Sequence, residues 1–257
     1  MGVDLLDIKN QAVKMADILM KTSSFIVNAR LWDGFFRQRL VIMVSLLAAI
    51  IIPYSVYELA KSKITSSEVV DSSRQSLAAM HNAVSWSSLF DGTNKYLVLI
   101  LIQMLVVYFS NRTIEYLSGV KISMTANELF KSQIRVIIVS VRNWVIELVI
   151  GIVIAIIIGI FGPSWLEDVM KFIVGCFFVG YLFIDNYNFT FGLTVKDSFS
   201  IVKKHAGAAL IVGFVAKVLL LLPVIGSLFV SLICSVAATW YMHTSEDKHA
   251  GIEAFPE

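Results

Sequence analysis

The feature that most constrains this chain is the stretch Ala206–His243, which is apolar almost throughout. It contains one charged residue, Lys217, and one break at residues 223–226, where the sequence reads Pro-Val-Ile-Gly. Proline removes a hydrogen bond inside a helix, and glycine commonly ends one. We therefore expect two apolar helical arms, Gly207–Leu222 and Ser227–Met242. Each arm is roughly 24 Å long, short of the roughly 30 Å hydrocarbon core, so a hairpin that dips into a bilayer fits better than two full spans.

The rest of the chain also indicates a lipid bilayer as its surroundings. Hydrophobic residues make up 57% of the sequence and charged residues 16%, against about 45–50% and 25% in soluble proteins. Further apolar segments occur at Leu40–Tyr57, Tyr96–Phe109, Val136–Phe161 and Phe172–Ile184. They are too long and too uniformly apolar for barrel strands. The sequence predicts an all-α integral membrane protein with about four long transmembrane or membrane-dipping helices and a C-terminal helical hairpin broken by Pro and Gly.

Three regions follow from this pattern. Residues 1–39 form an N-terminal segment whose apolar residues recur at helical spacing up to the point where the chain enters the membrane. This is typical of an amphipathic helix at the membrane surface, but also of a solvated helix packed on its own protein. Residues 40–242 form one helical membrane domain, with an extramembrane excursion at 61–95. Residues 243–257 are a polar tail.

Lysine and arginine predict the orientation. Segments 1–39, 111–135 and 195–206 contain thirteen of them, whereas the opposite segments 60–95 and 162–171 contain five. Because cytoplasmic loops are enriched in Lys and Arg, we expect both termini to be cytoplasmic.

Charged side chains within apolar helices are the strongest functional signal, because each costs several kcal/mol (about 2.5–3.5 on insertion scales) unless it is paired or hydrated. The candidates are Arg142, Glu147, Asp185 and Lys217, with Asn143 as a neutral polar companion. We estimate how deep each side chain lies in the bilayer by counting residues from the expected cytoplasmic end of its helix. Similar depths pair Arg142 with Asp185, and Glu147 with Lys217. The pairs either lock helices together or line a path for ions or protons.

Small residues recur every four positions in two runs. Such runs favour close helix packing in lipid, although a row of hydroxyls could also solvate a dehydrated oxyanion. The runs are Gly151, Ala155 and Gly159, and Ser227, Ser231, Ser235 and Thr239.

A basic face is predicted on the helix that contains Lys131, Arg135 and Arg142, which fall in one angular sector. This face is either a funnel for an anion or an anchor for phospholipid headgroups.

Enzyme signatures are missing from the sequence. The four histidines show no metal-ligand spacing, and there is no glycine-rich phosphate loop, nucleophile elbow or HExxH motif. We expect no catalytic activity, no metal and no cofactor. The net charge of +2 is too small to suggest nucleic acid as a partner.

Several polar points within the apolar helices resemble the C-terminal half of the CysZ and etoposide-induced-protein superfamily, over roughly residues 110–242. They are Arg142-Asn143-Trp144, Tyr181-Leu182-Phe183-Ile184-Asp185-Asn186-Tyr187, Lys203-Lys204-His205-Ala206-Gly207 and Leu221-Leu222-Pro223-Val224-Ile225-Gly226. The resemblance implies a multi-pass protein of the bacterial inner membrane, often oligomeric, with hairpins that dip into the bilayer.

The best-known members of that superfamily are described as sulfate permeases. The resemblance therefore implies transport of a small oxyanion such as sulfate. It also makes Arg30 and Arg37, near the start of the first span, candidates for the place where an anion enters, together with Lys131 and Arg135. The alternative is a non-transporting membrane scaffold or assembly partner of a larger complex, with the polar excursion 61–95 as its docking surface.

Overall fold

The computed structural model of the chain describes residues 5–33, 94–122, 126–222 and 225–245, and within these ranges it is helical without a strand. The predicted first span at 40–59 and nearly all of the excursion 61–95 lie outside the described residues, as do Arg37 and most of the C-terminal tail. The helices are α1 (Leu5–Asn28), α5 (Asn94–Ser118), α6 (Ala126–Phe161), α7 (Ser164–Thr190), α8 (Val195–Lys204), α9 (Ala206–Leu220), α10 (Ile225–Phe229) and α11 (Ser235–His243), with a π-helical turn at Val230–Cys234.

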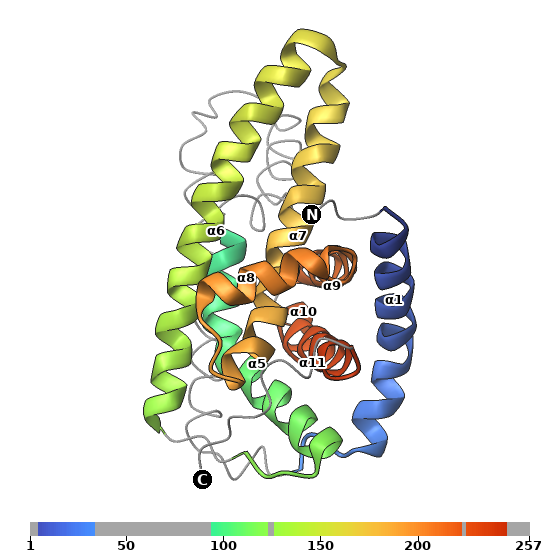
Figure 1. Ribbon diagram of the computed structural model, residues 1–257, viewed down its shortest axis with the longest axis vertical. Helices are drawn as coiled ribbons and strands as arrows, with labels where there is room; N and C mark the ends of the chain where they lie inside the picture. The colour runs from blue at the N-terminus through green and yellow to red at the C-terminus, as the bar shows by residue number, and fades with distance from the viewer. Residues whose placement is uncertain (1–4, 34–93, 123–125, 223–224, 246–257) are drawn as a thin grey trace, which may run out of the picture.

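The longest element is the antiparallel hairpin of α6 and α7, whose far end projects beyond the other helices (Figure 1). The two helices contain 36 and 27 residues, or roughly 54 and 40 Å at 1.5 Å per residue. Gly162 ends α6, and Pro163 precedes α7 with an extended backbone at φ −75° and ψ 144°. The connection between the two helices is therefore short, because Ser164 already begins α7.

Most of the packed core lies where α7, α9 and α11 meet, and α1 covers one side of it (Figure 1). The side chains of Met15, Ile18, Thr22 and Ile26 are buried along one face of α1. This face contacts α9 and α11. The N-terminal helix therefore packs on its own protein, and its place at a membrane surface stays a prediction.

The C-terminal region has the break that the sequence predicts. Helix α9 ends at Leu220, and the second arm begins at Ile225 and continues through the π-helical turn to His243. The sequence did not predict that turn, nor the 96° bend between α8 and α9.

Two helices among the described residues are long and apolar enough to cross a membrane, Phe130–Ile160 and Gly226–His243. A third is obtained if α8 and α9 are counted as one bent span. The predicted number of about four long helices therefore stays a prediction.

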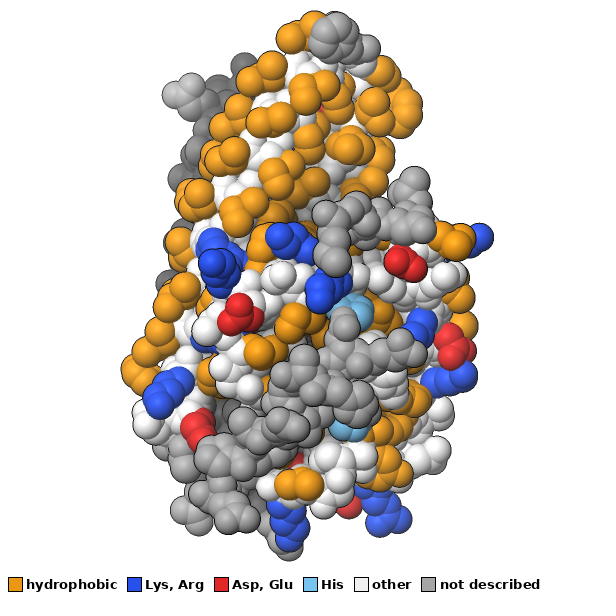
Figure 2. Space-filling view, in the orientation of Figure 1, with side chains coloured by type: hydrophobic (Ala, Val, Ile, Leu, Met, Phe, Trp, Pro, Cys, Tyr) orange, Lys and Arg blue, Asp and Glu red, His pale blue; other side chains and the backbone are white. Residues whose placement is uncertain are grey.

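The two candidate spans differ in their surroundings. In the most apolar window of Phe130–Ile160 only 17% of residues are buried, against 67% for Gly226–His243. Hydrophobic side chains cover the visible surface of the projecting hairpin, and most of the charged side chains in this view lie over the other helices (Figure 2). The hairpin thus presents an apolar surface that the described part of the chain leaves uncovered.

Candidate functional site

The first charged cluster joins α6 to α7 through Arg135 and Asp185. The Nε and Nη2 atoms of Arg135 donate to the two carboxylate oxygens of Asp185 at 2.9 and 2.7 Å. The Nη1 atom donates to the Leu193 carbonyl at 2.5 Å. The two side chains are 12% and 6% exposed, so this is a buried bidentate pair with a fixed geometry.

Arg142 lies two helical turns further along α6 and uses other partners. Its Nη2 atom donates to the Tyr181 hydroxyl at 2.9 Å, and that hydroxyl donates to Asp185 at 3.4 Å. Its guanidinium carbon lies 4.7 Å from the centre of the Phe199 ring on α8. Cation–π contact of this kind stabilises a guanidinium that is removed from water.

The predicted direct pair of Arg142 with Asp185 is therefore wrong: Tyr181 connects the two side chains, and Arg135 is the ionic partner. The depth estimate took Arg135 as the helix end, whereas α6 already begins at Ala126. In the antiparallel hairpin Arg135 lies opposite Asp185, and Arg142 lies opposite Tyr181, one turn before Asp185 on α7.

The loop between α7 and α8 closes this cluster. Gly192 has φ +72°, a conformation that glycine adopts without steric cost. Thr194 caps α8, its side chain accepting a hydrogen bond from the Asp197 amide at 3.2 Å. This turn brings the Leu193 carbonyl to Arg135 and the Val195 carbonyl within 3.5 Å of Arg142.

The cluster carries an excess of positive charge, because two guanidiniums face one carboxylate. The Nε atom of Arg142 is buried and has no hydrogen-bond partner among the described residues. A buried donor without a partner is costly, and natural proteins usually satisfy it with a ligand, an ion or ordered water. Chemically, the cluster can accept an anion.

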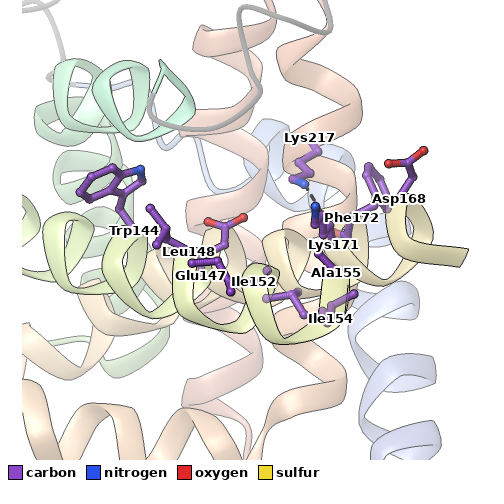
Figure 3. Close-up of a pocket in the computed structure, with 12 residues that line it drawn as sticks. Trp144, Glu147, Leu148, Ile152, Ile154, Ala155, Asp168, Lys171, Phe172 and Lys217 are labelled. Atoms are coloured by element: carbon purple, nitrogen blue, oxygen red, sulfur yellow. Dashed lines mark hydrogen bonds between the residues drawn. The ribbon is translucent and has the colours of Figure 1, made fainter. Parts of the chain in front are cut away.

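The second charged group lies in a groove between α6 and α7 (Figure 3). A Cβ atom built on Gly175 of α7 would lie 2.5 Å from Lys217 Nζ and 2.9 Å from Glu147 Oε1. The ammonium and the carboxylate therefore converge on Gly175, within the separation of an ion pair bridged by at most one water. The ammonium also donates to the Phe172 carbonyl at 3.4 Å and lies 4.5 Å from the Phe172 ring centre. This convergence agrees with the predicted pairing of Glu147 with Lys217.

The groove has a volume of about 680 Å³, within the usual range for ligand sites. Apolar side chains supply most of its lining. The charged side chains come from α6, α7 and, for Lys217, from α9. The lining residues are Trp144, Glu147, Leu148, Gly151, Ile152, Ile154, Ala155, Asp168, Lys171, Phe172, Val174 and Lys217.

The serine run serves packing. Ser231 donates to the Leu228 carbonyl at 2.8 Å, and Ser235 donates to the Ser231 carbonyl of the same helix. Thr239 shares a hydrogen bond with Ser110 of α5 at 2.7 Å, and Ser227 is buried. Because the hydroxyls of Ser231 and Ser235 are directed to backbone carbonyls, the structure favours helix packing over oxyanion binding for them.

The glycine run behaves differently from the prediction. Gly151 and Ala155 line the groove, and a Cβ on Gly159 would meet nothing within 4 Å. Close helix packing is instead found at Gly180, Gly207 and Gly213.

The remaining candidates for anion capture are spread over the surface. Lys131 is exposed on α6, one turn before Arg135. Arg30 is exposed after α1 with φ +47°, and the neighbouring Leu31 packs with Leu105 and Tyr108 of α5.

Buried amides are a further group of polar side chains in the helices, of which the sequence indicated Asn143 but not Gln103. Gln103 of α5 donates to Asn186 of α7 at 2.6 Å. Asn143 of α6 is fully buried, and neither of its amide atoms has a partner among the described residues. An amide within a long apolar run was the available signal for Gln103, but it does not identify the partner.

No protein-family model, no curated protein and no solved structure matches this chain. The fold and the two charged groups define it, in the residues described, as a helical protein with two helices apolar enough to span a membrane.

Proposed function

We propose that this protein transports a small oxyanion, sulfate being the first to test, across the bacterial inner membrane. One observation carries the proposal: two partly buried guanidiniums, those of Arg135 and Arg142, face a single buried carboxylate, that of Asp185. An oxyanion such as sulfate would offset the excess positive charge and accept a hydrogen bond from the unused Nε–H of Arg142.

The two arginines have different roles in this proposal. Arg135 is held by two carboxylate contacts and one carbonyl contact, so it positions Asp185 and α7. Arg142 has weaker neutral partners, Tyr181 and the Val195 carbonyl, and it is the group that binds the anion. Exposed Lys131 attracts anions to this end of α6, and Arg30 and Arg37 do so near the first predicted span.

Sulfate flux into liposomes that contain the purified protein tests the proposal. We expect uptake above that of empty vesicles, and Arg142→Gln to reduce it at least about tenfold, the loss typical of one charge-assisted hydrogen bond. Arg142→Lys should retain part of the flux. Lys196→Gln, an exposed position of α8, is the control for general electrostatics and should leave it unchanged. Uptake no faster than in empty vesicles, with the protein correctly inserted, would refute transport.

A non-transporting scaffold is the second candidate. The observation in its favour is that the contacts of Arg135 and Arg142 join α6 to α7 and to the start of α8, as structural contacts would. In that case Arg142→Gln lowers the melting temperature, and no anion flux is found for any variant.

We further propose a multi-pass arrangement with both termini cytoplasmic, in agreement with the distribution of Lys and Arg. The partners are the lipid bilayer and further copies of the chain. The uncovered apolar surface of the α6–α7 hairpin supports a lipid environment.

A further inference from the structure

The groove between α6 and α7 combines a charged lining with access from the apolar surface. Its residues Leu148, Ile152 and Phe172 are 46%, 52% and 43% exposed, so the groove opens where the hairpin is uncovered. Along α6 it extends from Trp144 to Ala155, roughly 16 Å at 1.5 Å per residue. A molecule that approaches along the apolar surface can therefore enter it sideways.

The floor of the groove is open because its residues are small. Gly151 has no side chain, and a Cβ there would meet only the Lys171 Cε atom, at 3.8 Å. Ala155 lies one turn further along the same face. Larger residues at these two positions would fill the groove from the α6 side.

The charges in the lining balance. Lys171 and Lys217 supply two ammonium groups, and Glu147 and Asp168 supply two carboxylates. Charged groups beside an apolar, lipid-like surface are costly unless they are paired, hydrated or in contact with a polar occupant. A lining with both signs is complementary to a zwitterion, because a purely anionic or cationic occupant would face like charges.

We propose that this groove binds the headgroup of a phospholipid with a primary amine, of the phosphatidylethanolamine type. The phosphate lies beside an ammonium of the lining, and the ammonium of the headgroup donates to Glu147 or Asp168. An acyl chain follows the apolar wall formed by Leu148 and Ile152. The inference does not rest on the proposed anion transport, which uses a different cluster.

The chemistry distinguishes this lipid from other lipids. A primary ammonium donates three hydrogen bonds, and charge-assisted bonds to carboxylates are among the strongest in proteins. A choline headgroup has the same net charge but no N–H donor. A glycerol headgroup has no ammonium group. The lipid is therefore a net anion, and its phosphate charge is repelled by the two carboxylates of the lining. Binding should therefore follow the order ethanolamine, then choline and glycerol.

Native mass spectrometry of the detergent-solubilised protein, titrated with phospholipids of identical acyl chains, tests the site. We expect the ethanolamine lipid to bind about tenfold more tightly than the choline and glycerol lipids. Gly151→Leu should remove this preference. Gly159→Leu is the matched control on the same helix, because Gly159 is open and does not line the groove, and it should retain the preference.

Each other outcome counts against the proposal. Equal binding of the three lipids, or the same preference in Gly151→Leu as in the wild type, would overturn it. Free phosphoethanolamine that competes as well as the lipid would overturn the assignment to a lipid. If Gly151→Leu does not fold, Asp168→Asn replaces it: its exposed side chain loses a carboxylate, and the preference for ethanolamine over choline should fall.

Discussion

Gly213 of α9 and Gly180 of α7 lie backbone to backbone: a Cβ atom on Gly213 would be 2.8 Å from the Gly180 amide nitrogen. The same Cβ would overlap the Cys176 carbonyl, and a Cβ on Gly180 would overlap the Ala209 carbonyl. Both glycines are fully or nearly fully buried. The two helices cross at a distance that only glycine allows, and this crossing fixes α9, with Lys217, against the hairpin.

Gly180→Ala should therefore destabilise the fold. The added methyl group meets rigid backbone, and overpacking of this kind costs typically about 1–3 kcal/mol. Gly159→Ala is the control, since Gly159 is open and in the same hairpin, and it should stabilise α6 by up to about 1 kcal/mol through helix propensity. Denaturation of both variants in one detergent measures the difference, and equal stabilities would contradict the close crossing.

Breaking the buried ion pair should be costly from either side. Asp185→Asn leaves Arg135 buried without its charge partner, and such changes cost about 3–5 kcal/mol. The double variant Arg135→Gln, Asp185→Asn should be less destabilised than the sum of the single variants, which a double-mutant cycle measures. Asp17→Asn breaks the exposed Asp17–Lys21 pair and should cost less than about 1 kcal/mol. Additive effects at Arg135 and Asp185 would argue against the pair.

Gln11 of α1 should stabilise the bend between α8 and α9. Its side chain donates to the Lys204 carbonyl at 2.6 Å and accepts from the Gly207 amide at 3.1 Å. Gln11→Ala removes both bonds and should cost about 1–2 kcal/mol. Gln11→Glu keeps the acceptor but loses the donor, so it should be intermediate in thermal stability. Hydrogen exchange at residues 204–207 should rise in Gln11→Ala, and unchanged exchange there would show that α1 does not hold the bend.

Lys217 and Glu147 should be energetically coupled. Lys217→Met leaves the Glu147 carboxylate in the groove without the neighbouring ammonium, whereas Lys217→Met with Glu147→Gln removes both charges. We expect the double variant to be more stable than Lys217→Met alone, with a coupling of about 1 kcal/mol. Unfolding of the four proteins in the cycle measures it. A coupling of zero would mean that the two groups only share the space beside Gly175.

The sequence predicted the local features of the fold well. It predicted the helical class from uniformly apolar segments, and a break at residues 223–226 from Pro223 and Gly226, which the structure places two residues earlier, after Leu220. These features depend on residues within one turn of each other, where proline and glycine act on the backbone directly. The sequence named all five charged residues of the two groups as candidates, but not how they assemble. It placed Arg135 at an anion entry and paired Arg142 with Asp185, whereas the structure pairs Arg135 with Asp185 and brings Glu147 and Lys217 together.

What the sequence by itself determined is the preference for helices with apolar surfaces and the positions where those helices stop, because these follow from the chemistry of neighbouring residues. Only the tertiary structure decided that Asp185 pairs with Arg135, that Gln11 binds the bend after Lys204, and that Gly151 lines a groove while Gly180 lies at a helix crossing. A helix presents the same side chains whatever it contacts. The register and angle at which two helices meet decide which of those side chains become partners.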